Sequence, residues 1–176
     1  MSKYNLDNIN SIGSTKILFD ANILIYLFWS TNLTWEKKYS VLYQRLIIQN
    51  NKFVLNFVII SEFINRILKI EYANYLKEHN ITEKEHSYKS FRDSEIGQEL
   101  QSDIYIVVQN KLLKKFEIID KEMTKSEIEN ILIVDILDFS DKFISKLCEE
   151  HKLILLTNDG DFKNSGVDIL SLNKKL

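Results

Sequence analysis

A short apolar run that ends in an aspartate constrains the fold of this chain more than any other feature. Ile17–Phe19 reaches Asp20 without a turn residue, and a second apolar run, Ile23–Phe28, follows at once. Such a run is typical of a strand buried on both faces of a parallel sheet. Asp20 then stands at the carboxyl end of that strand, where open α/β sheets bind their ligands, and a helix begins at Ala21 or Asn22. A carboxylate in so apolar a setting is costly unless a cation or hydrogen bonds compensate it. The alternative is that Asp20 caps the following helix.

Length and composition suit one globular domain over residues 1–176, with 45% apolar and 27% charged residues. No apolar run approaches the roughly 20 residues that span a bilayer, and the polar N-terminal stretch lacks the apolar core of a signal peptide. The single cysteine, Cys148, sits in a helical apolar pattern and is expected to be buried. We therefore expect a cytoplasmic protein with no membrane segment. A net charge of −2 argues against binding nucleic acid mainly through bulk charge.

Strands alternate with helices along the rest of the chain. After a polar stretch at 2–15, further strands are expected at 53–55, 116–119, 152–157 and 167–170. Helices are expected at 35–48, at 57–78 with Asn56 as N-cap, and after a capping box at 82–85. Further helices are expected from Asp93 or Ser94 to 115, at 128–137 after a second capping box at 124–127, and after Asp138 or Ser140. The apolar run 131–134 would suit a strand equally well. The alternation predicts a three-layer α/β/α fold around a parallel sheet of about five strands.

Acidic residues recur just beyond the predicted strands. Glu62 enters an apolar helix, Asp141 falls in the first turn of a helix, and Asp159 and Asp161 flank Gly160 directly after a buried strand. Each has an ordinary explanation when taken alone. Glu62 could form a surface ion pair with Arg66, Asp141 could simply suit the helix dipole, and Asp159 and Asp161 could belong to a polar surface turn. Because the carboxyl ends of parallel strands share one edge, these acids and Asp20 are expected to converge there, with Asp138 nearby.

Such a convergence predicts a metal site. Four to six carboxylates in one crevice repel one another severely without a counter-charge. Oxygen-only ligands, with no histidine or cysteine among them, favour the hard cations Mg²⁺ or Mn²⁺. Pairs of such ions activate water and stabilise negative charge on a phosphoryl oxygen.

Positive side chains near this edge are fewer. Lys69 follows Glu62 on the same helix face, and the stretch His86–Arg92 interleaves basic and aromatic residues, including Lys89 and Arg92. These three residues are weak candidates for holding an RNA backbone, with a ring free to stack on a base. The alternative is a solvated turn anchored by two rings.

At these positions the chain resembles the PIN-domain ribonucleases, and in particular the VapC-type toxins. The resemblance is carried by Ile17–Asn22, by Ser61–Glu62, by Asp141 opening a helix and by the segment Leu155–Phe162. It implies a metal-dependent endoribonuclease with Asp20, Glu62, Asp141 and Asp159 as metal ligands and Asn22 and Thr157 supporting them. It also implies an antitoxin that occupies the crevice, and a homodimer. A longer helical middle, at about 72–115, departs from the compact toxins.

Two other functions compete with this hypothesis. The run Ile17–Asp20 resembles the opening of haloacid-dehalogenase-like phosphatases, but that family needs an acid where Asn22 stands. The second is a non-catalytic module with the same fold that binds RNA or protein. A binding role gives no reason for so many close carboxylates.

Overall fold

A sheet of six parallel strands forms the centre of the computed structural model, which describes residues 2–30 and 34–176. In spatial order the strands are β1 (Lys3–Tyr4), β6 (Asp168–Leu170), β5 (Ile154–Leu156), β2 (Lys16–Phe19), β3 (Lys52–Leu55) and β4 (Glu117–Ile118). The predicted parallel α/β/α fold is confirmed, and the sheet exceeds the expected five strands by β1. That two-residue edge strand lies in the stretch 2–15, predicted to be a loop, where its short polar sequence carries no apolar signal.

The middle of the sheet is the most deeply buried part of the chain. Leu18 of β2 pairs with Val54 on one side and Leu155 on the other, and all three side chains are fully buried. Helices cover both faces, which explains why these strands are apolar throughout rather than alternating. Because every strand runs the same way, Asp20 after β2 and Thr157 after β5 emerge at one edge.

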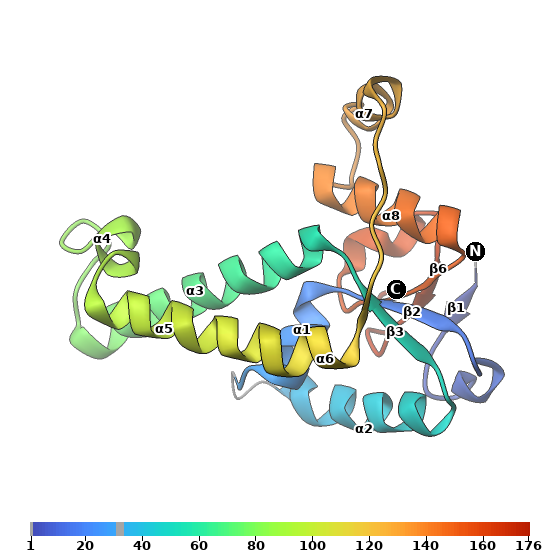
Figure 1. Ribbon diagram of the computed structural model, residues 1–176, viewed down its shortest axis with the longest axis horizontal. Coiled ribbons are helices and arrows are strands. Elements are labelled where there is room, and N and C mark those ends of the chain that lie inside the picture. Colours follow the sequence, from blue (N-terminus) through green and yellow to red (C-terminus); the bar gives the residue numbers. More distant parts are fainter. Residues whose placement is uncertain (1, 31–33) are drawn as a thin grey trace.

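Four helices flank the sheet directly: α1 (Ala21–Phe28), α2 (Thr34–Ile48), α3 (Phe57–His79) and α8 (Phe139–His151). Figure 1 shows α2 and α8 on opposite sides of the sheet. The Asn56 side chain accepts the N–H of Ile59 and starts α3 as predicted, while Asn80 ends it in the left-handed conformation. Of the break predicted at 31–34, residues 31–33 lie outside the described residues, and Thr34 already begins α2.

The middle of the chain forms a helical arm. It contains α4 (Tyr88–Arg92), α5 (Glu95–Val107), a π-helix (Val108–Leu112) and α6 (Leu113–Lys115). Helices α3 and α5 lie side by side and extend away from the sheet, with α4 at the tip (Figure 1). Ser94 caps α5 through the N–H of Gly97, so the predicted start of this helix is confirmed.

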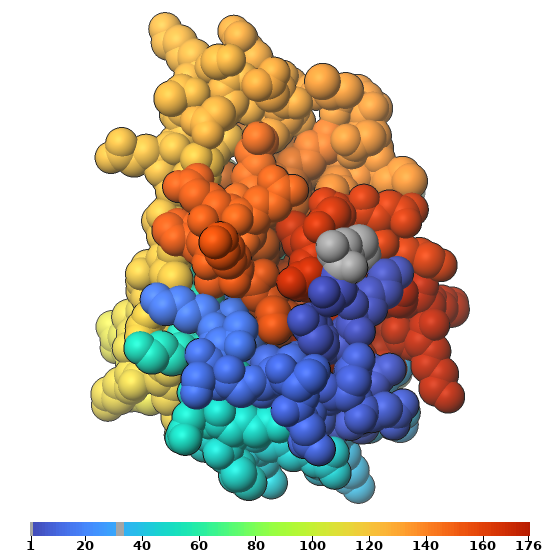
Figure 2. All heavy atoms as spheres, turned by 90° about the vertical axis from the view of Figure 1, so that its right-hand side faces the viewer, coloured from blue at the N-terminus to red at the C-terminus, as the bar shows by residue number. Residues whose placement is uncertain are grey.

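Two predicted helices were wrong in extent. The Thr82–Glu85 box does bond, because Glu85 accepts the Thr82 N–H at 2.7 Å, but it closes a single turn and the next helix begins only after Ser87. The box at Thr124 does cap a helix, α7 (Lys125–Ile131), which ends six residues before the predicted Leu137. The apolar residues that follow form neither helix nor strand and are largely exposed. Figure 2 shows this region as a lobe projecting from the molecule.

Two short 3-10 helices complete the described elements, Ile9–Ser11 and Gly160–Asn164. Cys148 is buried in α8, as predicted, and burial raises the pKa of its thiol to about 12. Across residues 2–30 and 34–176, no helix is both long enough and apolar enough to cross a membrane.

Candidate active site

Asp20 is held by hydrogen bonds rather than used as a helix cap. Its backbone carbonyl accepts the N–H groups of Ile23 and Leu24 in α1, but its side chain makes no capping bond. Oδ2 instead accepts the Thr157 hydroxyl at 2.5 Å and the Asn22 amide at 2.6 Å. The residue is 4% exposed, and burial raises the pKa of the carboxyl to about 6, although the Thr157 hydroxyl and the charge of Arg66 act in the opposite direction. The alternative of a simple cap is therefore wrong for the side chain.

The loop after β5 fixes this arrangement from the other side. The fully buried Thr157 donates to Asp20 and accepts the N–H of Asp159 at 2.9 Å. The N–H of Asn158 donates to Asn22 Oδ1 at 3.2 Å. Asn22 and Thr157 thus link the ends of two adjacent strands around one carboxylate.

Gly160, between Asp159 and Asp161, adopts no conformation that only glycine allows. It begins a 3-10 helix without a positive φ, and the Asp159 carboxylate accepts the N–H of Asp161 at 3.1 Å. The Asp161 side chain is exposed. Asp159 is therefore partly engaged as an N-cap, and Asp161 lies farther out along the loop.

Helices α3 and α8 bring the remaining acids to the same edge. Glu62 Oε1 accepts the Ser140 hydroxyl at 2.6 Å, and Glu62 Oε2 lies 3.9 Å from the Arg66 guanidinium. Asp138 accepts the N–H of Asp141 at 2.8 Å and so caps α8. The Ser140 hydroxyl also lies 2.9 Å from Asp138, but its single proton serves one carboxylate at a time.

Asp141 experiences the combined charge of this cluster. Burial, and after it the negative charges of Asp138, Asp20, Asp159 and Glu62, raise the pKa of its carboxyl to about 7. The acids predicted from four separate strand ends and helices are thus near enough to perturb one another. Among the described residues, however, no three acidic, histidine or cysteine side chains stand as a ready-made metal site.

Not every predicted residue reaches this site. Lys69 is exposed on α3, whereas Lys89 and Arg92 lie on α4 at the far tip of the arm (Figure 1). Arg92 pairs with Asp93 at 2.8 Å. Phe91 is buried, with its ring 5.4 Å from Tyr72 between centroids. The stretch 86–92 therefore leads into and forms α4 rather than the solvated turn, and its buried Phe91 ring is not free to stack on a base.

Sequence reasoning missed several residues that organise the site. Ser140 is expected from the sequence only as a helix cap, yet it donates to Glu62. Tyr39 has no site signal in the sequence, yet its hydroxyl donates to Asn158 Oδ1 at 2.8 Å. Asn158 also lies 3.4 Å from the Tyr26 hydroxyl. The only available signal was that Asn158 stands between two predicted site residues, Thr157 and Asp159.

Comparison with known proteins identifies the family of this chain. The family model described as PIN domain matches residues 17–167. A solved structure of VapBC2 from Rickettsia felis, bound to a DNA fragment from their promoter, is similar in fold with a TM-score of 0.51 and 16% identity, covering 89% of this chain and 98% of that one. The comparison with curated proteins found no match. Because the family model spans most of the sequence, including every acid of the cluster, the chain belongs to the PIN domain family.

Proposed function

We propose that this chain is a metal-dependent endoribonuclease and the toxin of a toxin–antitoxin pair. One observation carries the proposal. Asp20, Glu62 and Asp159 lie near enough to Asp141 for their charges to raise the pKa of its carboxyl, although the four residues come from four separate segments. Carboxylates are rarely buried together without a counter-charge, because their mutual repulsion is costly. Family membership supports a nuclease as the reason for keeping them together.

The donor set fits a hard divalent cation. Its groups are carboxylate oxygens, with no histidine or cysteine among the predicted ligands, which suits Mg²⁺ or Mn²⁺. The cation acting on Asp20 is Arg66, which is also 3.9 Å from Glu62, so one guanidinium faces several carboxylates. Asp20, Glu62, Asp141 and Asp159 would hold the ion, and a role for Asp161 stays a prediction. When bound, the ion would neutralise phosphate charge and lower the pKa of water.

The protein's own groups orient the site. Both side-chain bonds described for Asp20 fall on Oδ2, which leaves Oδ1 for a ligand. Ser140 holds one oxygen of Glu62 in the same way. Because these donors are neutral, they fix the position of each carboxylate and leave its negative charge in place. We infer that RNA lies across this edge with the phosphodiester to be hydrolysed facing these acids.

Purified protein incubated with total cellular RNA tests the proposal, with Mn²⁺ in one arm and a chelator in the other, and with the cut ends mapped. Asp20→Asn should reduce cleavage by more than the about 10–100-fold typical of groups that only support a metal ligand. The exposed Asp103→Asn on α5 is the matched control and should cleave normally. Cleavage by Asp20→Asn at the wild-type rate, or cleavage that persists in chelator, would overturn the assignment.

A non-catalytic RNA- or protein-binding module is the second candidate. Calorimetry decides between the two, because a nuclease of this kind should bind Mn²⁺ and lose that binding in Asp141→Asn. A wild-type protein that binds no Mn²⁺ would support the module.

We also propose two protein partners. An antitoxin is suggested by the similar fold of the VapBC2 structure, and an inhibitor protein that abolishes cleavage would bear this out. A second copy of the chain is suggested by exposed apolar side chains, which gather between residues 105 and 139.

A further inference from the structure

A pocket of about 620 Å³ lies at the β1–β6 end of the sheet and takes no part in the acidic site. Its lining comes from β1 and the turn after it, from the segment after β6, and from α2. Asn5 follows β1 and Ser171 follows β6, so the pocket opens at the carboxyl edge, as the acidic site does. Its volume falls within the about 300–1,000 Å³ usual for small-molecule sites.

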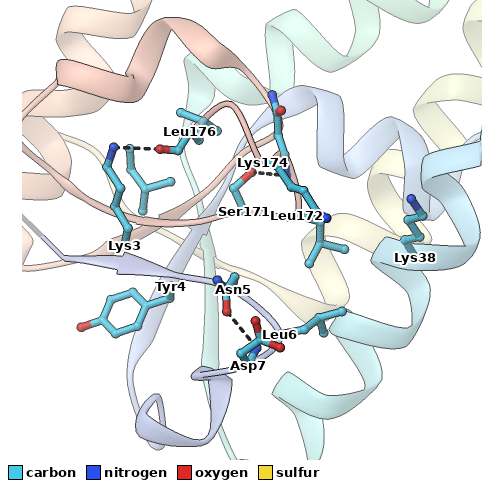
Figure 3. Close-up of a pocket in the computed structure, with 12 residues that line it drawn as sticks. Lys3, Tyr4, Asn5, Leu6, Asp7, Lys38, Ser171, Leu172, Lys174 and Leu176 are labelled. Carbon is cyan, nitrogen blue, oxygen red and sulfur yellow. Dashed lines mark hydrogen bonds between the residues drawn. The ribbon is translucent and has the colours of Figure 1, made fainter.

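The pocket combines positive charge with an apolar wall. Figure 3 shows Lys3 and Lys38 on opposite sides, with Lys174 between them. The Lys3 ammonium donates to the carbonyl of Leu176 at 2.8 Å, and the Lys38 ammonium lies 4.8 Å from the centroid of the Trp35 ring. Asp7 is the one acid among the lining residues, so positive charge predominates. Leu6 and Leu172 supply the apolar surface.

Hydrogen bonds connect this pocket to the acidic site. Asn173 lines the pocket and donates to the carbonyl of Asn158 at 3.0 Å, and the N–H of Asn158 donates to Asn22, the residue that holds Asp20. Strand β6 is two strands from β2, which at about 4.8 Å per strand is roughly 10 Å. A short run of nucleotides spans such a distance along the edge.

We infer that this pocket holds a nucleotide of the RNA strand beside the phosphodiester that is cleaved. Lys38 and Lys174 bind its phosphate, and Leu6 and Leu172 pack against its base or sugar. The inference rests on the proposed nuclease function for the identity of the strand. The chemical class of the ligand, an anionic group joined to an apolar one, is inferred from the lysines and leucines that line the pocket. The acidic site repels phosphates, so a basic pocket on the same edge gives the strand a positively charged anchor.

Binding measured without hydrolysis tests the inference. A labelled single-stranded RNA is titrated into the protein in chelator and followed by fluorescence anisotropy over a range of salt concentrations. Lys38→Gln with Lys174→Gln should weaken binding about tenfold or more and lower the salt slope by about 0.7, because the two lysines bind one phosphate and each lost phosphate contact contributes about 0.7 for single strands. Lys111→Gln with Lys114→Gln removes the same charge from exposed positions near the other edge of the sheet and is the control.

A second measurement uses small probes. Adenosine monophosphate should shift the amide resonances of residues 4–7 and 171–174, and inorganic phosphate should do so more weakly, because it lacks the apolar group. Equal RNA binding by the two double variants, or shifts confined to other residues, would overturn the inference. RNA cleavage that is normal in the pocket variant at low RNA concentration would count against it while leaving the nuclease proposal intact. Binding that depends on Lys38 and Lys174 in a protein that never cleaves RNA would support the pocket and overturn the nuclease.

Discussion

Asp141 illustrates at the residue scale how a functional cluster costs stability. Its folded-state pKa of about 7 lies above the ordinary value of 3.8, so the protonated form is favoured by folding. This stabilisation is complete below pH 3.8 and is lost as the pH rises through about 7. The difference between these two pKa values corresponds to about 4 kcal/mol, and we halve it to about 2 kcal/mol because the side chain is partly exposed to solvent. Asp141→Asn should therefore raise the free energy of unfolding of the metal-free protein by about 2 kcal/mol at pH 8 and little at pH 4.

Urea denaturation in chelator at the two pH values measures this difference, with Asp103→Asn as the exposed control. A variant no more stable than the wild type at pH 8 would show that Asp141 is not destabilised by its neighbours. If Mn²⁺ stabilises the wild type but not Asp141→Asn, the same charge is used to bind the ion.

The convergence of the acids was predictable because Asp20 and Asp159 closely follow apolar strands, Glu62 enters an apolar helix after a strand, and parallel strands bring their carboxyl ends together. The hydrogen-bond partners of these acids were harder to predict from the sequence. Asn22 and Thr157 lie next to predicted acids, but the Ser140–Glu62 bond joins residues 78 positions apart on helices whose packing no local pattern specifies. The same holds for the Tyr39 hydroxyl, whose ring looks like any core aromatic.

Among the elements, the arm depends on the close approach of α4 and α5. A Cβ on Gly97 would lie 2.1 Å from the carbonyl oxygen of Phe91 and 2.7 Å from that of Arg92, and both are backbone atoms. Gly97→Ala should therefore separate the two helices. Overpacking costs about 1–3 kcal/mol, and the gain in helix propensity of up to about 1 kcal/mol offsets only part of it. We expect a net loss of about 1–2 kcal/mol, measured by urea denaturation.

Gly160→Ala provides the matched comparison, because nothing lies within 4 Å of its added Cβ and its φ is not positive. It should leave the unfolding midpoint almost unchanged. A Gly97→Ala variant as stable as Gly160→Ala would contradict this prediction, because it would mean that α4 and α5 can move apart at little cost in free energy.

The sequence predicted most elements because their apolar periodicity agrees with the burial seen in the fold, as in α2, α3 and β2. It failed where a local pattern is complete within one turn. Thr82 and Glu85 satisfy each other without any following helix. The run 131–134 was read as helix or strand because apolar residues are expected to be buried, yet Val134 is 95% exposed.

For the whole molecule, those exposed residues matter most. Between Tyr105 and Phe139 the chain exposes a series of large apolar side chains along α5, α6, β4 and the lobe of α7, including Leu132, Ile133 and Ile136. Exposed apolar side chains that form one contiguous patch mark interaction sites, and the proposed homodimer would use these. The same stretch carries lysines near α6 and acids around α7, and these unlike charges would attract one another in a dimer that sets α6 of one copy against α7 of the other.

A homodimer through this face makes a specific prediction. Val134→Lys with Ile136→Lys should convert the dimer to a monomer, because each copy would then bury two charges against apolar surface. Sedimentation velocity measures the change, and Ile48→Lys, which alters a 79% exposed residue on α2, should leave the dimer intact. A wild-type protein that is monomeric at micromolar concentration would contradict the proposal. Equal dissociation by both variants would place the interface elsewhere, since the effect would then follow added charge rather than the position of the exposed segment.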